Sequence, residues 1–387
     1  MRRGMSPTNR LREGTSKMSE SGIVDTKEFQ KDPVKYYLKQ KESLGRAEGT
    51  ILNLEAKFDR LYNYLDDPLE ANLKDLLGYY NTVKKETNLS DKAIQGDLIL
   101  LSALTKMAIT AGLKDENPAE HAIKKLNSQL DLNPPSRMRI EMEEMIEFLN
   151  WLIHPFERAV FLTFLKTGIR AGELLNIDLC CVHIDHPIYE AILDQQDITL
   201  RPEVSDKPDS LFIYPEFAVG TVVNGEKRLS GNKRKRDDGS VIPIDTELKT
   251  ALLEYLLIKP YTETSAQPLF VKNNLKGKKN PRYAYGGLNS RLIDGVLAEY
   301  GWWEPNSQTD EKVTFHYFRH YFSNNHRELK GVYSKSIPRP TLKYIRGDKP
   351  ETDDALEEHY THESWQNWKA HVRDPYLKNV YQFGVYD

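Results

Sequence analysis

The chain has 387 residues, of which 39% are hydrophobic and 29% are charged, and its formal net charge is −3. This length exceeds one ordinary domain, so we expect two domains with separate hydrophobic cores. The charge argues against a protein that binds nucleic acid through bulk positive charge alone, so the positions of its basic residues matter more than their sum.

Membrane and secretory classes are not favoured. We find no apolar run that approaches the length needed to cross a bilayer, and the arginines near the amino terminus have no apolar segment behind them. We therefore expect a cytoplasmic protein without a membrane partner. The two cysteines, Cys180 and Cys181, are adjacent, which rules out a CxxC metal clip, and we expect them to be small core residues.

The first third of the chain predicts a helical domain over residues 28–130. It follows residues 1–27, which lack apolar periodicity and are expected to be disordered. Ile51, Phe58 and Leu65 belong to a helical pattern that Pro68 stops. Further helices are expected through residues 69–80, from a cap at Ser90 to Gly112, and from Pro118.

A second domain is expected over residues 137–387, after a linker at 131–136 that contains Pro134-Pro135. Two helices open it, and Gly168 should break the second, so that Arg170 lies at a helix end or turn. Strands are expected at 182–185, 198–201, 220–223 and 241–244. The basic run 233–239 between the last two predicts a β-hairpin with a cationic tip. The predicted fold class is mainly α with a small antiparallel β-sheet.

A helix over residues 314–322 would place His316, Arg319 and His320 on one face. Three phenylalanines fall on the adjacent face at helical spacing, so the helix would be anchored in the core while its polar face meets an anion. His316 and His320 also have the i,i+4 spacing of a zinc site. No glutamate and no third ligand stand where such a site needs them, and we expect no metal.

Three motifs stand in a fixed order: Thr167-Gly168-Ile169-Arg170-Ala171-Gly172-Glu173-Leu174, His316-Tyr317-Phe318-Arg319-His320, and Tyr360-Thr361-His362. In order and separation they resemble the catalytic boxes of the tyrosine recombinases, or phage-type integrases, most closely the archaeal branch. The resemblance covers roughly residues 32–381. It implies a helical, SAM-like core-binding domain that clamps DNA, a catalytic domain, and site-specific recombination of duplex DNA through a 3′-phosphotyrosyl intermediate. It also implies a homotetramer on DNA, no cofactor and no small-molecule substrate.

The resemblance assigns roles to individual residues. Arg170 and Arg319 match the two arginines that hold the phosphate, a task that suits the planar, permanently charged guanidinium. Glu173 matches the acid that orients the first arginine. His316 would accept a proton or donate to the phosphate, with His320 in support. Tyr360 matches the nucleophile, whose phenol needs neighbouring cations to attack; Tyr381 and Tyr386 are the fallback.

Two positions stay open. Lys235 falls closest to the family's lysine that protonates the leaving 5′ oxygen, and Lys233 is its rival. Asp348 stands where the family usually has a histidine that supports the scissile phosphate. An acid there is unfavourable unless it orients a cation, for which Arg346 or Lys349 is available.

The remaining expectations concern DNA contact and an alternative function. The aromatic segment 365–380 should pack on a neighbouring protomer or on its own domain. Asp348 favours the alternative of a catalytically degenerate recombinase that only binds DNA, and a type IB topoisomerase ranks lower because of the helical amino-terminal module. Basic side chains expected to face DNA are Lys57, Arg234, Arg236, Lys278, Lys279 and Arg282.

Overall fold

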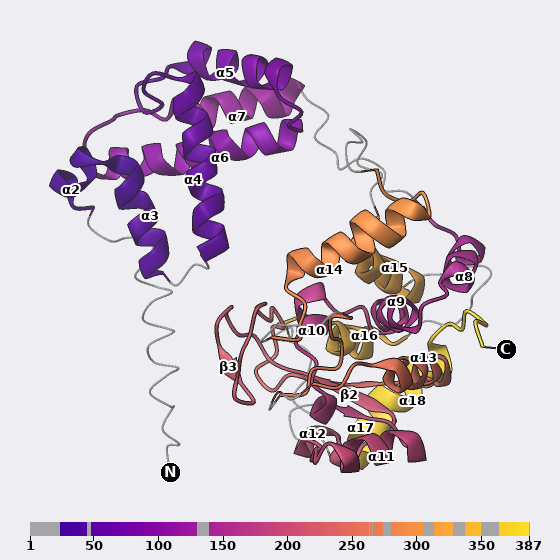
Figure 1. The fold of residues 1–387 in the computed structure, drawn as a ribbon. Helices are drawn as coiled ribbons and strands as arrows, with labels where there is room; N and C mark the ends of the chain where they lie inside the picture. Colours follow the sequence, from indigo (N-terminus) through magenta and orange to yellow (C-terminus); the bar gives the residue numbers. More distant parts are fainter. Residues whose placement is uncertain are drawn as a thin grey trace, which may run out of the picture. The chain divides into compact units, whose positions relative to one another are not determined.

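The computed structural model describes residues 24–44, 48–129, 139–262, 264, 266–273, 280–304, 313–327, 337–349 and 364–386. The chain divides into two compact units, residues 1–135 and 136–387, each with its own hydrophobic core (Figure 1). The linker expected at 131–136 lies outside the described residues.

The first unit is a helical bundle in which α6 contacts α3, α4, α5 and α7 and contributes many of the core residues (Figure 1). Ser90 caps α6 as expected, with its Oγ accepting from the Ala93 amide at 3.3 Å. Its first helix begins at Thr26, inside the segment expected to be disordered, because Asp25 caps it. Its helices are α2 (Thr26–Lys31), α3 (Pro33–Ser43), α4 (Glu48–Tyr64), α5 (Leu73–Glu86), α6 (Asp91–Thr110) and α7 (Pro118–Gln129).

Helix α6 is long and apolar enough, by length and composition, to cross a membrane, contrary to our expectation that no such run exists. Its apolar surface has another partner, because 56% of the window is buried inside the unit. On this helix, the fully buried Asp97 accepts hydrogen bonds from the Arg60 Nε and Nη2 and from the Tyr79 hydroxyl, each at 2.8 Å. These bonds connect α4, α5 and α6. We therefore interpret α6 as the core helix of this bundle.

Helices surround a small sheet in the second unit (Figure 1). The left-handed Gly168 (φ 60°) ends α9 as predicted. The helices are α8 (Met142–Trp151), α9 (Pro155–Thr167), α10 (Ala171–Leu175), α11 (Pro187–Gln195), α12 (Pro202–Ser205), α13 (Thr246–Ile258), α14 (Tyr285–Arg291), α15 (Phe315–Arg327), α16 (Arg339–Arg346), α17 (Trp365–Trp368) and α18 (Asp374–Asn379), with a 3₁₀ turn η1 (Leu179–Cys181) and π-helical turns η2 (Leu292–Leu297) and η4 (Lys369–Arg373).

The sheet is antiparallel in the order β1 (Val182–His183), β2 (Ser210–Ile213), β5 (Ser240–Pro243). Its central strand β2 was not predicted, because all four of its residues are buried and it shows no alternation. The strand expected at 198–201 is wrong. That segment is a loop, in which the Arg201 amide donates to the Cys180 carbonyl and Pro202 then starts α12.

The hairpin with a cationic tip is also wrong. Strand β3 (Val222–Val223) pairs with β4 (Glu226–Lys227), not with β5. The turn between them is Asn224-Gly225, both at positive φ (51° and 75°), the Asn-Gly signal that favours a two-residue hairpin. The basic run follows the second arm of this hairpin as an extended segment.

The carboxy-terminal segment packs on its own unit. The Trp368 Nε1 donates to the Val241 carbonyl at 2.9 Å, and the Tyr376 hydroxyl to the Lys166 carbonyl at 2.9 Å. The buried Lys166 Nζ in turn binds Asp245 at 2.7 Å and Glu247 at 2.6 Å, and it donates to the Tyr381 carbonyl at 2.6 Å. We refer to these groups around Lys166 as the tail clasp. Of the two expected placements of the tail, the structure has the one on the chain's own domain.

Candidate active site

The end of α9 and the start of α10 position Arg170. A Cβ at Gly168 would lie 2.3 Å from the Phe322 ring, so only glycine lets this turn approach α15 so closely. The buried Glu173 accepts from the Arg170 amide with one oxygen and from the Arg170 Nη1 with the other, both at 2.9 Å. The Arg170 side chain keeps 28% of its surface exposed, while Glu173 has none. One edge of this guanidinium is therefore fixed and the rest faces outward.

Arg319 lies on α15, 3% exposed, and is held by the same turn. Its Nη1 donates to the Gly168 carbonyl at 2.6 Å and to the Arg346 carbonyl at 2.9 Å, and its Nη2 to Asp348 Oδ1 at 3.0 Å. Burial lowers the pKa of Arg319 to about 10, with the nearby Arg170 acting in the same direction. The side chain still carries its charge at neutral pH, so two guanidiniums are held beside one turn.

A cavity of about 430 Å³ opens at these two arginines. Its wall comes from α10, from the segments before β3 and after β4, from the start of α14 and from α15. Four of its residues, Arg170, Lys233, His316 and Arg319, can hold or protonate an anion. The other lining residues are Ala171, Gly172, Glu173, Val219, Leu229, Ser230, Gly231, Tyr285 and Phe315.

No protein-family model and no curated protein matches this sequence. Solved structures do match. The Tn1549 transposon integrase in complex with circular intermediate DNA superposes with a TM-score of 0.56 and 18% identity, over 87% of this chain and 98% of the integrase. A lambda integrase tetramer bound to a Holliday junction gives a TM-score of 0.51 and 14% identity, over 91% of this chain and 90% of that one. This chain has the tyrosine-recombinase fold.

Within this fold, Lys233 and Lys235 lie on the same side of an extended segment. Exposed and buried residues alternate along it, so that both lysines project outward while Arg234 and Arg236 project inward. Only Lys233 lines the cavity. Lys235 is fixed through its backbone, whose amide donates to the Gly347 carbonyl at 3.1 Å. The cavity therefore favours Lys233, the rival in the sequence analysis, over Lys235.

Asp348 sits beside Arg319. One carboxylate oxygen accepts from the Arg319 Nη2 at 3.0 Å, and the other lies 3.4 Å from the Arg346 Nε. The expected pairing with Arg346 is thus present, and the pairing with Arg319 was not foreseen. Asp348 does not line the cavity. The acid therefore orients cations, which is the condition under which the sequence analysis expected an acid to be tolerated at this position.

The two histidines differ in position. His316 is exposed and lines the cavity, whereas His320 lies one turn further along α15 and is half-buried. Their rings meet edge to face at 4.4 Å between centroids. His316 can therefore reach a bound anion directly. His320 contacts the His316 ring and does not line the cavity.

Three arginines expected to face DNA are buried instead. Arg234 is fully buried, and its guanidinium donates to Ser240 and to the carbonyls of Tyr344 and Ile345 at 2.9, 3.1 and 2.5 Å; burial lowers its pKa. Arg236 is 7% exposed and lies over the Tyr344 ring at 4.8 Å. Arg282 is 1% exposed. These side chains make contacts inside the second unit and have little surface to offer DNA.

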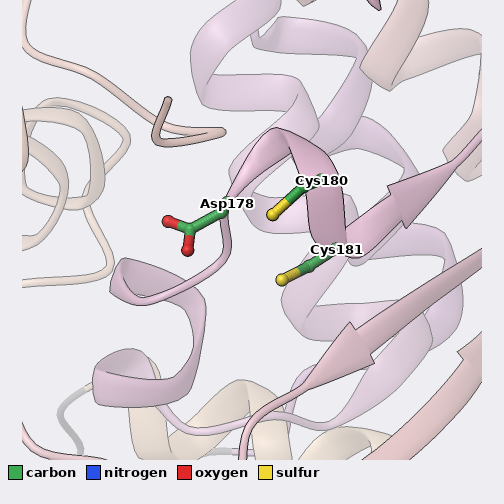
Figure 2. A group of neighbouring side chains, drawn as sticks. All are labelled: Asp178, Cys180 and Cys181. Carbon is green, nitrogen blue, oxygen red and sulfur yellow. The ribbon is translucent and has the colours of Figure 1, made fainter. Parts of the chain in front are cut away.

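Arg282 belongs to a buried charge cluster at the base of the β3–β4 hairpin. It binds Asp178 and also Glu226 at 3.0 Å, and Arg228 binds the same aspartate through both donors. Asp178 and the two cysteines project from one turn with ligand atoms close enough for a metal (Figure 2). The two guanidiniums already occupy that carboxylate and would repel a cation, so this group does not fit a metal site. Its contacts fix the hairpin that carries Val219 and Leu229 to the cavity.

The nucleophile assigned by resemblance, Tyr360, lies outside the described residues, as do Lys278 and Lys279. The fallback tyrosines do not fit. The Tyr381 hydroxyl donates to the Leu165 carbonyl at 2.8 Å, and burial raises its pKa well above 10. The Tyr386 hydroxyl donates to Glu254 at 2.8 Å, and burial raises its pKa too. Neither phenol can ionise easily, and neither lines the cavity.

Two further features complete the comparison with the sequence. Lys57, on α4 of the first unit, is partly exposed, and its Nζ lies against Gly96 of α6, where a Cβ would come within 3.1 Å of it. Tyr285 lines the cavity, although the sequence analysis did not single it out. In the sequence, Tyr285 stands directly before Gly286-Gly287. This pattern does not predict a ligand contact by itself, and only the cavity shows that Tyr285 can make one.

Proposed function

We propose that this chain is a site-specific DNA recombinase of the tyrosine type, which cleaves and rejoins duplex DNA through a 3′-phosphotyrosyl intermediate. One observation carries the proposal: Arg170, Lys233, His316 and Arg319, from three distant segments, line a single cavity. Phosphodiester cleavage needs fixed positive charge around the phosphorus and a proton donor for the leaving oxygen, and this set supplies both.

The proposed steps follow from these groups. The Tyr360 oxygen attacks phosphorus, the bond from phosphorus to the 5′ oxygen breaks, and Arg170 and Arg319 hold the oxygens on which charge develops. His316 accepts the phenolic proton, and Lys233 gives a proton to the 5′ oxygen. The 5′-hydroxyl of a second strand reverses the attack. Because the phosphotyrosine keeps the energy of the bond, the chemistry requires neither a nucleotide nor a metal.

The arginines differ in how firmly they are held. Arg319 has three acceptors in the protein, whereas Arg170 has one carboxylate partner and a more exposed guanidinium. We infer that Arg319 is a fixed positive wall and that Arg170 makes the more adaptable contact with the phosphate. Glu173 and Asp348 act as positioning residues for Arg170 and Arg319, and the buried Arg234 supports Glu173.

The assembly is part of the proposal. The lambda integrase structure is a tetramer on a Holliday junction. We propose a homotetramer that bridges two duplex sites in the cytoplasm, with the helical unit clamping DNA through residues such as Lys57 and with Lys278 and Lys279 as further contacts. An archaeal-type member is proposed from Ile345-Arg346-Gly347-Asp348, which has an acid after the glycine.

A second candidate is a degenerate recombinase that binds DNA without cutting it. The contact of Asp348 with the Arg319 Nη2 favours it, because one donor of this arginine is already occupied. The other contacts of Arg319 keep it in the cavity wall whether or not Asp348 is present. We therefore prefer the enzyme.

The deciding experiment traps the intermediate. The protein is incubated with a duplex that carries the repeats flanking its gene and a nick just 3′ of the cleavage position, so that the short 5′-hydroxyl fragment is lost, and denaturing electrophoresis reveals a covalent adduct. Wild type should form the adduct and Tyr360→Phe should not. Tyr386→Phe, which removes a hydroxyl that donates to Glu254 and lies away from the cavity, is the matched control and should still form it.

Each failure has its own meaning. Binding of the same duplex without an adduct would support the degenerate recombinase. An adduct with Tyr360→Phe would move the nucleophile elsewhere, with Tyr333, the other tyrosine between Arg319 and the tail that lies outside the described residues, tested next.

A further inference from the structure

The cavity at the arginines has an apolar side. Val219 and Leu229, on the two arms of the hairpin, and Tyr285, at the start of α14, line it together with the cations. Their exposed fractions are 62%, 39% and 53%. Apolar side chains of this size, left exposed beside an anion-binding wall, indicate a ligand that has a flat apolar face next to its negative charge.

Tyr285 is the residue best placed to meet such a face. Its ring contacts Phe315 edge to face, at 6.1 Å between centroids and 80° between planes, so Phe315 covers at most one face of it. Phe315 itself is 3% exposed and stacks on Phe164, which makes it a rigid base. With 53% of its surface exposed, the Tyr285 ring keeps room for a partner.

Phe315 also precedes His316 on α15, so the helix that carries His316 and Arg319 also contacts the Tyr285 ring. A nucleoside attached to a phosphate combines a charge for Arg170, His316 and Arg319 with a flat base for Tyr285. The volume of about 430 Å³ lies in the range of small-ligand pockets.

We propose that Tyr285 stacks on the base of the nucleoside adjacent to the scissile phosphate and so positions the phosphorus between the arginines. This rests on the proposed function, whose chemistry supplies the nucleotide. Every base has a π-face, so stacking on Tyr285 adds affinity and placement without choosing the DNA sequence. The charge of the arginines and the face of the tyrosine recognise the two halves of one nucleotide.

The test is nucleotide binding, followed through saturation transfer to the ligand in NMR titrations. The probes are thymidine 3′-monophosphate, thymidine 5′-monophosphate and inorganic phosphate. For wild type we expect transfer to the base protons and a Kd at least about ten-fold lower for one nucleotide than for inorganic phosphate, as base–aromatic stacking provides. The nucleotide that binds better identifies which neighbour of the phosphate is stacked.

The variants separate stacking from fold effects. Tyr285→Phe should keep the preference for the nucleotide, and Tyr285→Ala should lose it while binding inorganic phosphate unchanged. Tyr261→Ala, a tyrosine 62% exposed that does not line the cavity, is the matched control and should behave as wild type. Nucleotide binding that is unchanged in Tyr285→Ala, or no tighter than that of inorganic phosphate in wild type, would overturn the inference.

Binding is measured without DNA cleavage, so the two proposals fail separately. Stacking that depends on Tyr285, in a protein that forms no covalent adduct, refutes the recombinase and leaves the nucleotide site standing. An adduct from wild type together with unchanged nucleotide binding by Tyr285→Ala leaves the recombinase and removes the role of this tyrosine.

Discussion

Replacing Glu173 by glutamine is expected to loosen the candidate site and destabilise the second unit. Its side chain has no exposed surface and lies between two cations, Arg170 at 2.9 Å and Arg234 at 3.5 Å. Glutamine has nearly the same shape but carries no charge, and one of its two ends is an N–H donor that would face an arginine or the Arg170 amide.

The magnitude follows from what each arginine loses. Breaking a buried ion pair by removing one partner costs about 3–5 kcal/mol. Arg170 is 28% exposed and regains water, whereas Arg234 is fully buried and keeps two carbonyls and a hydroxyl. We therefore expect the lower end, about 3 kcal/mol, which lowers the Tm of a domain of this size by roughly 6–12 °C. A misplaced Arg170 should slow adduct formation by about 100-fold.

The assay combines thermal unfolding with adduct formation at a temperature where the variant is folded. The control is Glu203→Gln, whose carboxylate pairs with Arg201 at the surface with 34% exposure, so less than about 1 kcal/mol is expected. A Glu173→Gln protein that melts with the control and forms the adduct at the wild-type rate would refute the view that this carboxylate fixes Arg170.

Three further outcomes are expected. Lys233→Ala should slow adduct formation by about 100-fold or more on ordinary DNA, and a substrate with a 5′-thiol leaving group, which needs no acid, should restore the rate. Lys235→Ala should stay within about ten-fold of the wild-type rate. Equal defects in the two variants would reject Lys233 as the acid. Gly347→Ala should lower the free energy of unfolding, measured in urea, by about 2–4 kcal/mol, because φ of Gly347 is 66° and a Cβ would lie 2.5 Å from the buried Arg234 side chain. Gly286→Ala is the control and should be neutral or slightly stabilising, because a Cβ there meets nothing within 4 Å. Burial lowers the pKa of His326 to about 3, below its unfolded value of about 6.5, so the unfolded state binds more protons between these pH values and the protein becomes less stable as the pH drops. In urea unfolding, His326→Phe should remove about 2 kcal/mol of the stability that wild type loses between pH 7 and 5. An unchanged dependence of stability on pH would contradict this.

The local signals of the helices made most of them predictable. Ser90 caps α6, Gly168 ends α9 in the left-handed conformation, and α15 presents His316 and Arg319 as their spacing requires. These features depend on neighbours within a few residues, so the sequence carries them directly.

Strand pairing and the burial of charged side chains were harder to predict from the sequence. The fully buried β2 shows no alternation, and the Asn-Gly turn at 224–225 was overlooked in favour of a basic run. Arg234 and Arg282 looked like DNA contacts because charge is visible in a sequence while its burial partners are not. Their acceptors, such as the Ile345 carbonyl and Asp178, lie about 100 residues away along the chain and are known only from the fold.

The tail clasp makes the surroundings of Lys166 depend on residues more than 200 positions further along the chain. A premature stop codon after Asn379 would leave every proposed reacting group in the gene product. It would also remove the Tyr381 carbonyl from the ammonium of Lys166, whose helix ends at Thr167, three positions before Arg170. Such a truncation should therefore weaken the support of a buried charge near the first arginine, although it removes none of the proposed reacting residues.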